Sequence, residues 1–274
     1  MLFQLYFTRV HTMLSYQHNY HAGSCADVHK HTALAIILAK LITKDKPLCY
    51  LETHAGRGIY DLSSTAAHKT QEAKHGILPL LATETVLAPP YLQAIRLTQS
   101  TYGKDCYPGS PLIAKTLLRK KDEMHLMELH PQEYKILKQH MSSANIHIHH
   151  RDGYEGVLAL SPPKIRRGLV LMDPSYEVKS EYAKAADFVL ALHRKWPEAV
   201  LLLWYPLLQE GYHLSLRRSL EQANLPKFWQ QEVMFTEIRS RAIEGSGLLC
   251  VNLPFSTARD LRQYCLYPIA SETS

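Results

Sequence analysis

The sequence predicts an α/β protein whose mostly parallel sheet carries helices on both faces. Short apolar runs recur along the chain and end in polar residues, as buried parallel strands do. Stretches with helical periodicity separate these runs, which is the alternation that builds a parallel sheet. The 274 residues, of which 46% are hydrophobic and 20% charged, indicate a globular chain with room for one large core and an insertion.

Seven candidate strands and six candidate helices follow from these patterns. The strands are expected at 48–53, 124–129, 146–150, 169–173, 200–205, 228–236 and 247–253. The helices are expected at 25–41, 110–120, 131–140, 153–160, 181–195 and 213–223. Pro111 and Pro131 fit the first turns of their helices, where the missing N–H costs nothing. The last two strands are expected to form an antiparallel pair at one sheet edge.

The segment from Ile59 to about Tyr107 interrupts the alternation. It is too long for an ordinary strand-to-helix loop, so we expect an inserted helical subdomain over 59–106. Its predicted helices are 69–84 and 90–102.

Charge and cysteine content narrow the class of protein. The net charge of +6 favours a polyanionic partner moderately. Five scattered cysteines, without a CxxC pair, argue against a zinc ribbon or a disulfide framework and fit a reducing cytoplasm. No apolar run reaches membrane-spanning length, and the first residues lack the features of a signal peptide. Met13 is an alternative start, which would make 1–12 an N-terminal extension.

The most informative stretch is the strand at 169–173 with the residues that follow it. It delivers Asp173, Pro174, Ser175 and Tyr176 to the carboxyl end of a central strand, where open α/β sheets bind ligands. The Asp173 carboxylate and the Pro174 carbonyl could accept both hydrogens of an exocyclic nucleobase amine, and the Tyr176 ring could stack on the base. The alternative is that Asp-Pro-Ser only opens a loop.

Three other strand ends suggest a nucleoside ligand without phosphate. Glu128 follows the second strand, where a carboxylate can accept from both ribose hydroxyls, and Asp152 could contact an adenine amine. The Gly56 and Gly58 turn is a weak nucleotide signal, because it is not GxGxxG. No glycine-rich phosphate cradle with a basic partner is visible. S-adenosylmethionine, which has a ribose, an adenine and a sulfonium but no phosphate, fits this pattern.

Histidines are frequent, but we expect no metal. His18, His21, His29 and His31 lack carboxylate or thiolate partners at ligand spacing. The histidines at 147, 149 and 150 are expected to be strand-edge residues.

Four strings of the sequence resemble a known family. They are SYQHNYHAGSCADVHKH at 15–31, YPGSPLIA at 107–114, MELHP at 127–131 and DPSY at 173–176. In this order they resemble RlmJ, a bacterial methyltransferase family that acts on adenine N6 in 23S ribosomal RNA. The resemblance runs from Met13 to about Phe255. It departs at Ser175, where the family has a second proline.

The resemblance implies a Rossmann-like S-adenosylmethionine-dependent methyltransferase fold with a seven-stranded, mostly parallel sheet. Its domain would comprise 13–58 and 107–255, leaving 256–274 as a C-terminal tail. It also implies a cytoplasmic, RNA-binding enzyme without metal or membrane association, monomeric, with 23S ribosomal RNA as substrate. Asp173, Pro174 and Tyr176 would be catalytic. The implied cofactor residues are His31, His54, Ser110, Glu128, Asp152, Gly153 and Asp173, and the implied RNA contacts are Tyr16, His18 and Lys30.

Two other functions remain open at this stage. A DNA adenine-N6 methyltransferase would use the same loop, and a catalytically silent RNA-binding relative would retain the fold. Protein glutamine methylation is disfavoured, because such enzymes usually have Asn at the position of Asp173. Further RNA contacts are expected around the mouth of the site from Arg57, Lys164, Arg166, Arg167, Arg239 and Arg241.

Overall fold

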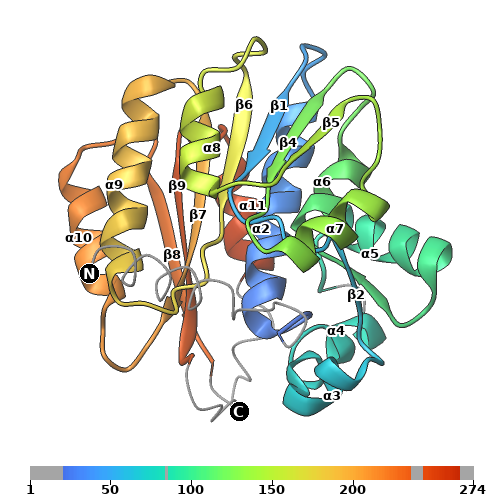
Figure 1. Ribbon diagram of the computed structural model, residues 1–274. Coiled ribbons are helices and arrows are strands. Elements are labelled where there is room, and N and C mark those ends of the chain that lie inside the picture. The colour runs from blue at the N-terminus through green and yellow to red at the C-terminus, as the bar shows by residue number, and fades with distance from the viewer. Residues whose placement is uncertain (1–20, 84–85, 236–242, 266–274) are drawn as a thin grey trace, which may run out of the picture.

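The computed structural model describes residues 21–83, 86–235 and 243–265. Its main sheet has seven strands in the order β5-β4-β1-β6-β7-β9-β8 (Figure 1). Five strands are parallel, and they are β1 (Cys49–Glu52), β4 (Glu123–Met127), β5 (Ile146–His149), β6 (Gly168–Met172) and β7 (Val200–Leu207). Strand β9 (Gly245–Val251) runs antiparallel to β7 and to the edge strand β8 (Trp229–Met234). The sheet confirms the predicted fold class.

Helices cover both faces of the sheet (Figure 1). On one face, α2 (Cys25–Ile42) contacts α6 (Ser110–Leu117) and α11 (Thr257–Tyr264). On the other lie α8 (Gly153–Leu160), α9 (Ser180–Lys195) and α10 (His213–Gln222), while α7 (Pro131–His140) contacts β5. None of the helices described here is both long and apolar enough to cross a membrane.

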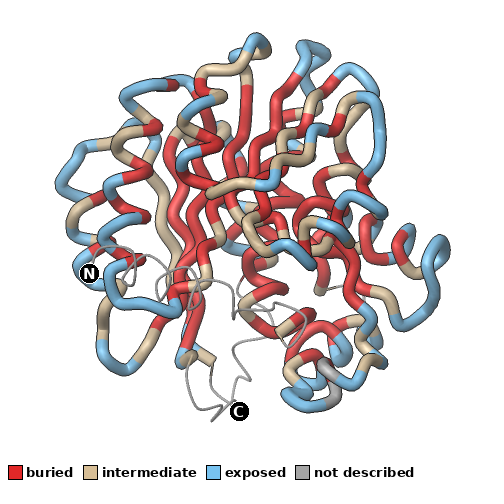
Figure 2. The backbone as a smooth tube through the Cα atoms, in the orientation of Figure 1, coloured by how far each residue is buried: buried red, intermediate tan, exposed pale blue. Residues whose placement is uncertain are grey.

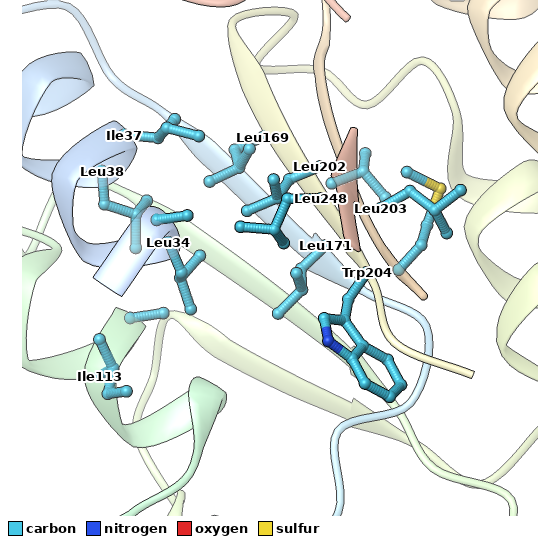
Figure 3. Packing of buried hydrophobic residues seen from close by; sticks show 14 of the residues in the cluster. Leu34, Ile37, Leu38, Ile113, Leu169, Leu171, Leu202, Leu203, Trp204 and Leu248 are labelled. Carbon is cyan, nitrogen blue, oxygen red and sulfur yellow. The ribbon is translucent and has the colours of Figure 1, made fainter. Parts of the chain in front are cut away.

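Helix α2 lies inside the molecule, because 14 of its 18 residues are buried. Figure 3 shows Leu34 and Leu38 of this helix in the same buried hydrophobic cluster as Leu169 and Leu171 of β6. The strands form the continuous buried centre in Figure 2. Burial of α2 on all sides takes its polar residues into the interior as well. That placement needs partners for the charged groups of the helix.

The segment predicted as an insertion is bounded by a two-stranded ribbon, in which β2 (Ile59–Asp61) pairs antiparallel with β3 (Cys106–Pro108). Between them lie α3 (Thr65–Thr70), the 3₁₀ turn η2 (Glu72–Lys74), α4 (Ile77–Thr83) and α5 (Pro89–Tyr102). The predicted single helix at 69–84 is therefore wrong. The chain breaks at Gln71, whose φ of 56° is left-handed, and at Gly76, where a Cβ would lie 2.1 Å from the Gly23 oxygen.

The ends of the chain are described only in part. The extension predicted at 1–12 and the alternative start at Met13 lie outside the described residues. The segment predicted as a tail at 256–274 contains α11, and its residues 266–274 also lie outside.

Candidate active site

Two cavities meet at the carboxyl ends of the central strands. Both are lined by Lys30, Asp173 and Ser175. The first extends toward the ends of β1, β4 and β5, and the second toward β7 and the start of α2. The residues shared by the cavities therefore form the boundary between them.

The loop after β6 supplies the carboxylate of this boundary. The five residues of β6 are all buried between β1 and β7, and the strand stops at Met172. Asp173 follows with a side chain that is 13% exposed. Tyr176 takes a left-handed φ of 53°, which turns the chain away from the sheet.

Lys30 reaches Asp173 from the first turns of α2. Its Nζ lies 2.5 Å from Asp173 Oδ2 and 3.0 Å from Asp27 Oδ1. Ser24 caps the helix by accepting from the Asp27 N–H, and Asp27 Oδ2 accepts from the Gly23 N–H. Asp27 therefore fixes the helix start and also holds the ammonium.

Together with Asp27, which lies beside it in the second cavity, the boundary holds two carboxylates and one ammonium, a formal charge of −1. Burial disfavours the ammonium, but Asp173 and Asp27 outweigh it, so the pKa of Lys30 is raised. Glu52, at the end of β1, has a pKa raised to about 8 by burial, against hydrogen bonds from Ser110 and Tyr50. The boundary is thus suited to a cationic ligand.

The first cavity brings together all seven residues that the resemblance implies for the cofactor. It is lined by His31, His54, Ser110, Glu128, Asp152, Gly153 and Asp173. They come from six separate segments of the chain, so only the fold makes them neighbours. Several are fixed by other protein groups. His31 Nδ1 lies 2.7 Å from the Tyr107 hydroxyl, and His54 Nδ1 lies 2.7 Å from Thr53 Oγ1.

Glu128 is held by the backbone. One carboxylate oxygen accepts from the Gly56 N–H and the other from the His130 N–H, each at 2.7 Å. Burial raises its pKa to about 7, although these hydrogen bonds favour the ionised form. Each oxygen retains a second lone pair, so the carboxylate can still accept from a ligand hydroxyl.

Asp152 and Gly153 form the next wall of this cavity. Asp152 caps α8 by accepting from the Glu155 N–H at 2.9 Å, and its second oxygen lies 3.8 Å from Lys184 Nζ. A Cβ on Gly153 would lie 1.9 Å from the Thr53 carbonyl oxygen. The backbone of α8 can approach β1 this closely only with glycine at this position.

The second cavity is more apolar. Its lining includes Tyr176, Trp204, Pro206 and Phe235 together with the Lys30–Asp173 pair. The Lys30 ammonium lies 5.5 Å from the centre of the Trp204 ring. An aromatic wall beside a carboxylate matches a flat heterocycle that carries an amine.

Tyr176 supports the aromatic wall of the second cavity mainly by packing against its neighbours. Its hydroxyl donates to the Trp204 carbonyl at 2.9 Å, and its ring lies 4.5 Å from that of Tyr182. Only 6% of the residue is exposed, so in this conformation a small part of the ring can meet a base. Trp204 and Phe235 add aromatic surface that the sequence did not predict.

Comparison with known proteins identifies the family. A family model described as "Ribosomal RNA large subunit methyltransferase D, RlmJ" matches residues 45–271. The chain belongs to the RlmJ family. Two curated relatives are both named "Ribosomal RNA large subunit methyltransferase J". The Escherichia coli protein is 34% identical over 91% of this chain and 90% of its own length. The Haemophilus influenzae protein is 35% identical over 93% of this chain and 92% of its own.

A solved structure shares the fold of this RlmJ-family chain. Protein LPL1258 from Legionella pneumophila superposes with a TM-score of 0.80 at 34% identity. The match covers 88% of this chain and 90% of that one.

The basic residues predicted to contact RNA do not all lie around the mouth of the site in this RlmJ-family chain, and some lie outside the described residues. Arg166 and Arg167 precede β6, at the end of the sheet opposite the cavities, and Lys164 lies in the same loop (Figure 1). Arg57 borders the site, but its guanidinium pairs with Glu133 through two hydrogen bonds of 2.5 and 2.8 Å. Tyr16, His18, Arg239 and Arg241 lie outside the described residues.

The sequence also left parts of the site unpredicted. Asp27 carried a helix-start pattern but no signal for its contact with the Lys30 ammonium. Glu181 lines the first cavity from α9 and accepts from Tyr154 at 2.8 Å. Nothing local in the sequence distinguishes either acid from a surface residue.

Proposed function

We propose that this protein transfers a methyl group from S-adenosylmethionine to the exocyclic N6 of an adenine in 23S ribosomal RNA. The observation that carries the proposal is the partly buried carboxylate of Asp173 at the boundary of two cavities, one polar and one aromatic. The names of the relatives support ribosomal RNA as the substrate class. The chemistry of the boundary supports an amine as the acceptor.

The first cavity fits S-adenosylmethionine. Glu128 and Asp152 offer acceptors to ribose hydroxyls and an adenine amine. Lys30, which lines this cavity, and Arg57, which borders it, are each held by a carboxylate, so neither is positioned for a phosphate. The net negative boundary complements a sulfonium. S-adenosylmethionine supplies a methyl group that its sulfonium already activates for attack.

The second cavity fits the target base. Lys30 occupies Asp173 Oδ2, so Oδ1 is the oxygen we assign to one amine hydrogen, while the Pro174 carbonyl accepts the other. These two acceptors concentrate the nitrogen lone pair toward the first cavity. Trp204, Phe235 and the exposed part of Tyr176 sandwich the base. A stacked adenine cannot enter, so the nucleotide is flipped out or taken from an irregular region.

The residues act by positioning and electrostatics. Asp173 orients the amine for in-line displacement, and Lys30 fixes the rotamer of Asp173. The amine proton becomes acidic only as the nitrogen–carbon bond forms, and Asp173 takes it up at that point. Tyr16 and His18 are proposed to contact the nucleotide, and the protein is proposed to act as a cytoplasmic monomer.

The decisive test is transfer of labelled methyl to 23S ribosomal RNA that lacks its native modifications. Wild type should place label in N6-methyladenosine, whereas Asp173→Ala should bind cofactor and transfer none. Duplex DNA is the competing substrate, and label there alone would replace the RNA assignment. Binding of RNA without methyl transfer would instead identify the protein as a catalytically silent RNA-binding relative. Equal loss of cofactor binding and transfer in Asp173→Ala would give Asp173 a structural role.

A further inference from the structure

A cluster of histidines lies on the sheet outside both cavities. His125 of β4 pairs in register with His147 of β5, and His149 follows two residues later on the same face. The ring centres of His125 and His147 are 4.7 Å apart, and those of His125 and His149 are 5.5 Å apart. None of the three lines either cavity.

Two other metal-ligating side chains flank His125. Cys49 and Glu123 are the first residues of β1 and β4 and stand opposite each other in register. One ligating atom each of Cys49, Glu123 and His125 lies within 4.8 Å of the other two. Cys49 is fully buried, and Glu123 and His125 are partly buried. These first strand residues lie at the end of the sheet opposite the catalytic boundary.

Hydrogen bonding orients the His125 ring toward this group. Its Nδ1 lies 3.2 Å from His149 Nε2, within hydrogen-bond distance. Its Nε2 lies 3.9 Å from Glu123 Oε2, which is too long for a hydrogen bond. When Nδ1 donates to His149, the lone pair of Nε2, the nitrogen beside the Glu123 carboxylate, is available to a metal ion. A ligating histidine whose other nitrogen is held by a neighbour is the usual arrangement in metal sites.

We propose that Cys49, Glu123 and His125 form a binding site for a divalent transition-metal ion of the Zn²⁺ type. One thiolate, one carboxylate and one imidazole are ligands that Zn²⁺ accepts, and water would complete a tetrahedral set. We expected no metal from the sequence, because its histidines lacked nearby partners. The partners come from separate strands, and only their pairing shows them.

Binding requires a small closure and the loss of one proton. Ligand atoms in a tetrahedral zinc site are about 3.3–3.8 Å apart, so the present group must contract by about 1 Å. The Glu123 side chain, 42% exposed at a strand start, can make this movement. The Cys49 thiol binds by exchanging its proton, which is released to solvent, for a sulfur–metal bond.

The site would fasten β1 to β4 at the amino ends of the strands. Only the folded chain brings the ligands together, so bound metal raises the midpoint of thermal unfolding in proportion to the logarithm of its concentration. This role is separate from methyl transfer, and it holds whatever the substrate of the enzyme is.

The test is titration of the purified full-length protein with Co²⁺ alone. One ion should bind per chain and produce a thiolate-to-cobalt charge-transfer band in the near ultraviolet. Cys49→Ala should abolish the band, and Cys106→Ala, which removes a partly exposed thiol elsewhere, should retain it. Glu123→Gln and His149→Gln should each weaken binding about 10–100-fold. Excess Zn²⁺ should displace Co²⁺ and erase the band.

Two results would overturn the proposal. One is the absence of Co²⁺ and Zn²⁺ binding at submillimolar metal. The other is binding without a charge-transfer band, or with a band that survives in Cys49→Ala, because either places the ion elsewhere. If Cys49→Ala does not fold, Glu123→Gln decides the matter, and an unchanged affinity in that variant contradicts the site.

Discussion

The Lys30 ammonium lies 2.5 Å from the Asp173 carboxylate although the two residues are 143 positions apart in the chain. Lys30 is 97% buried, and its second partner, Asp27, lies one helical turn away at 3.0 Å. The pair therefore joins the first helix described in the structure to the loop after β6. It also fixes the carboxylate that we propose accepts the adenine amine.

Lys30→Met should destabilise the protein by about 3–5 kcal/mol, because it leaves the buried carboxylate of Asp27 and the partly buried one of Asp173 without their cation. Urea unfolding followed by circular dichroism measures this change. Lys40→Met, on the exposed end of the same helix, is the matched control and should stay within about 0.5 kcal/mol of wild type. A loss for Lys30→Met no greater than that of the control would mean that the ion pair contributes little.

Cofactor affinity should fall as the pH drops through neutrality. Burial raises the pKa of Glu128 to about 7, so lowering the pH from 8 to 6 protonates it. Protonation removes acceptor capacity for the ribose hydroxyls, and the dissociation constant should rise roughly five- to tenfold. Burial lowers the pKa of the neighbouring His54, which favours its neutral form.

Calorimetry across this pH range checks the expectation. The glutamine in Glu128→Gln cannot be protonated in this range, so the affinity of the variant for the cofactor should be weaker but should not change between pH 6 and 8. A wild-type profile as flat as that of the variant would exclude Glu128 as the titrating group.

Gly153→Ala should impair the cofactor cavity. The new Cβ would meet the Thr53 carbonyl oxygen at 1.9 Å, so α8 must move away from β1. Overpacking of this kind typically costs about 1–3 kcal/mol. We expect cofactor binding to weaken at least about tenfold, as the same movement displaces Asp152. Glu155→Ala, exposed on the same helix, should change neither quantity, and wild-type affinity in Gly153→Ala would contradict the close-packing argument.

Ser175→Pro should leave the rate of methyl transfer within about threefold of wild type, a change of under 1 kcal/mol in the barrier. Ser175 lines both cavities, but the carbonyl assigned to the amine belongs to Pro174, which is present. The proline restricts φ without adding a contact. Single-turnover kinetics on ribosomal RNA measures the effect. If wild type were inactive and Ser175→Pro active, methyl transfer would require a more rigid loop after β6 than the one in this protein.

Local sequence patterns predicted the elements of the sheet well. The expected strand at 169–173 corresponds to Gly168–Met172, and the expected helix at 131–140 to Pro131–His140. Both are marked by short-range features, an apolar run in one case and an N-terminal proline in the other. The helix expected at 69–84 was wrong because its break at Gly76 depends on the distant backbone of Gly23.

The contacts of the site needed tertiary information. The order of the strands in the sheet decides which strand ends are neighbours. The cofactor residues could therefore be named by resemblance, but the sequence did not predict that they line one cavity. The basic residues before β6 were misplaced for the same reason, since they enter the sheet at its far end. Trp204, inside a long apolar strand, gave no local sign that its ring borders a cavity.

The packing of α11 and β9 against α2 has a consequence for synthesis of the chain. Among the described helices, the one that carries Lys30 is translated first, whereas two of the elements that pack against it are made within the last 30 residues described. Leu261 of α11 is fully buried in the shared core. A message truncated before the codon of Leu261 would therefore still encode every residue of the proposed active site. It would yield no working enzyme, because α2 cannot be buried until α11, which packs against it, has been translated.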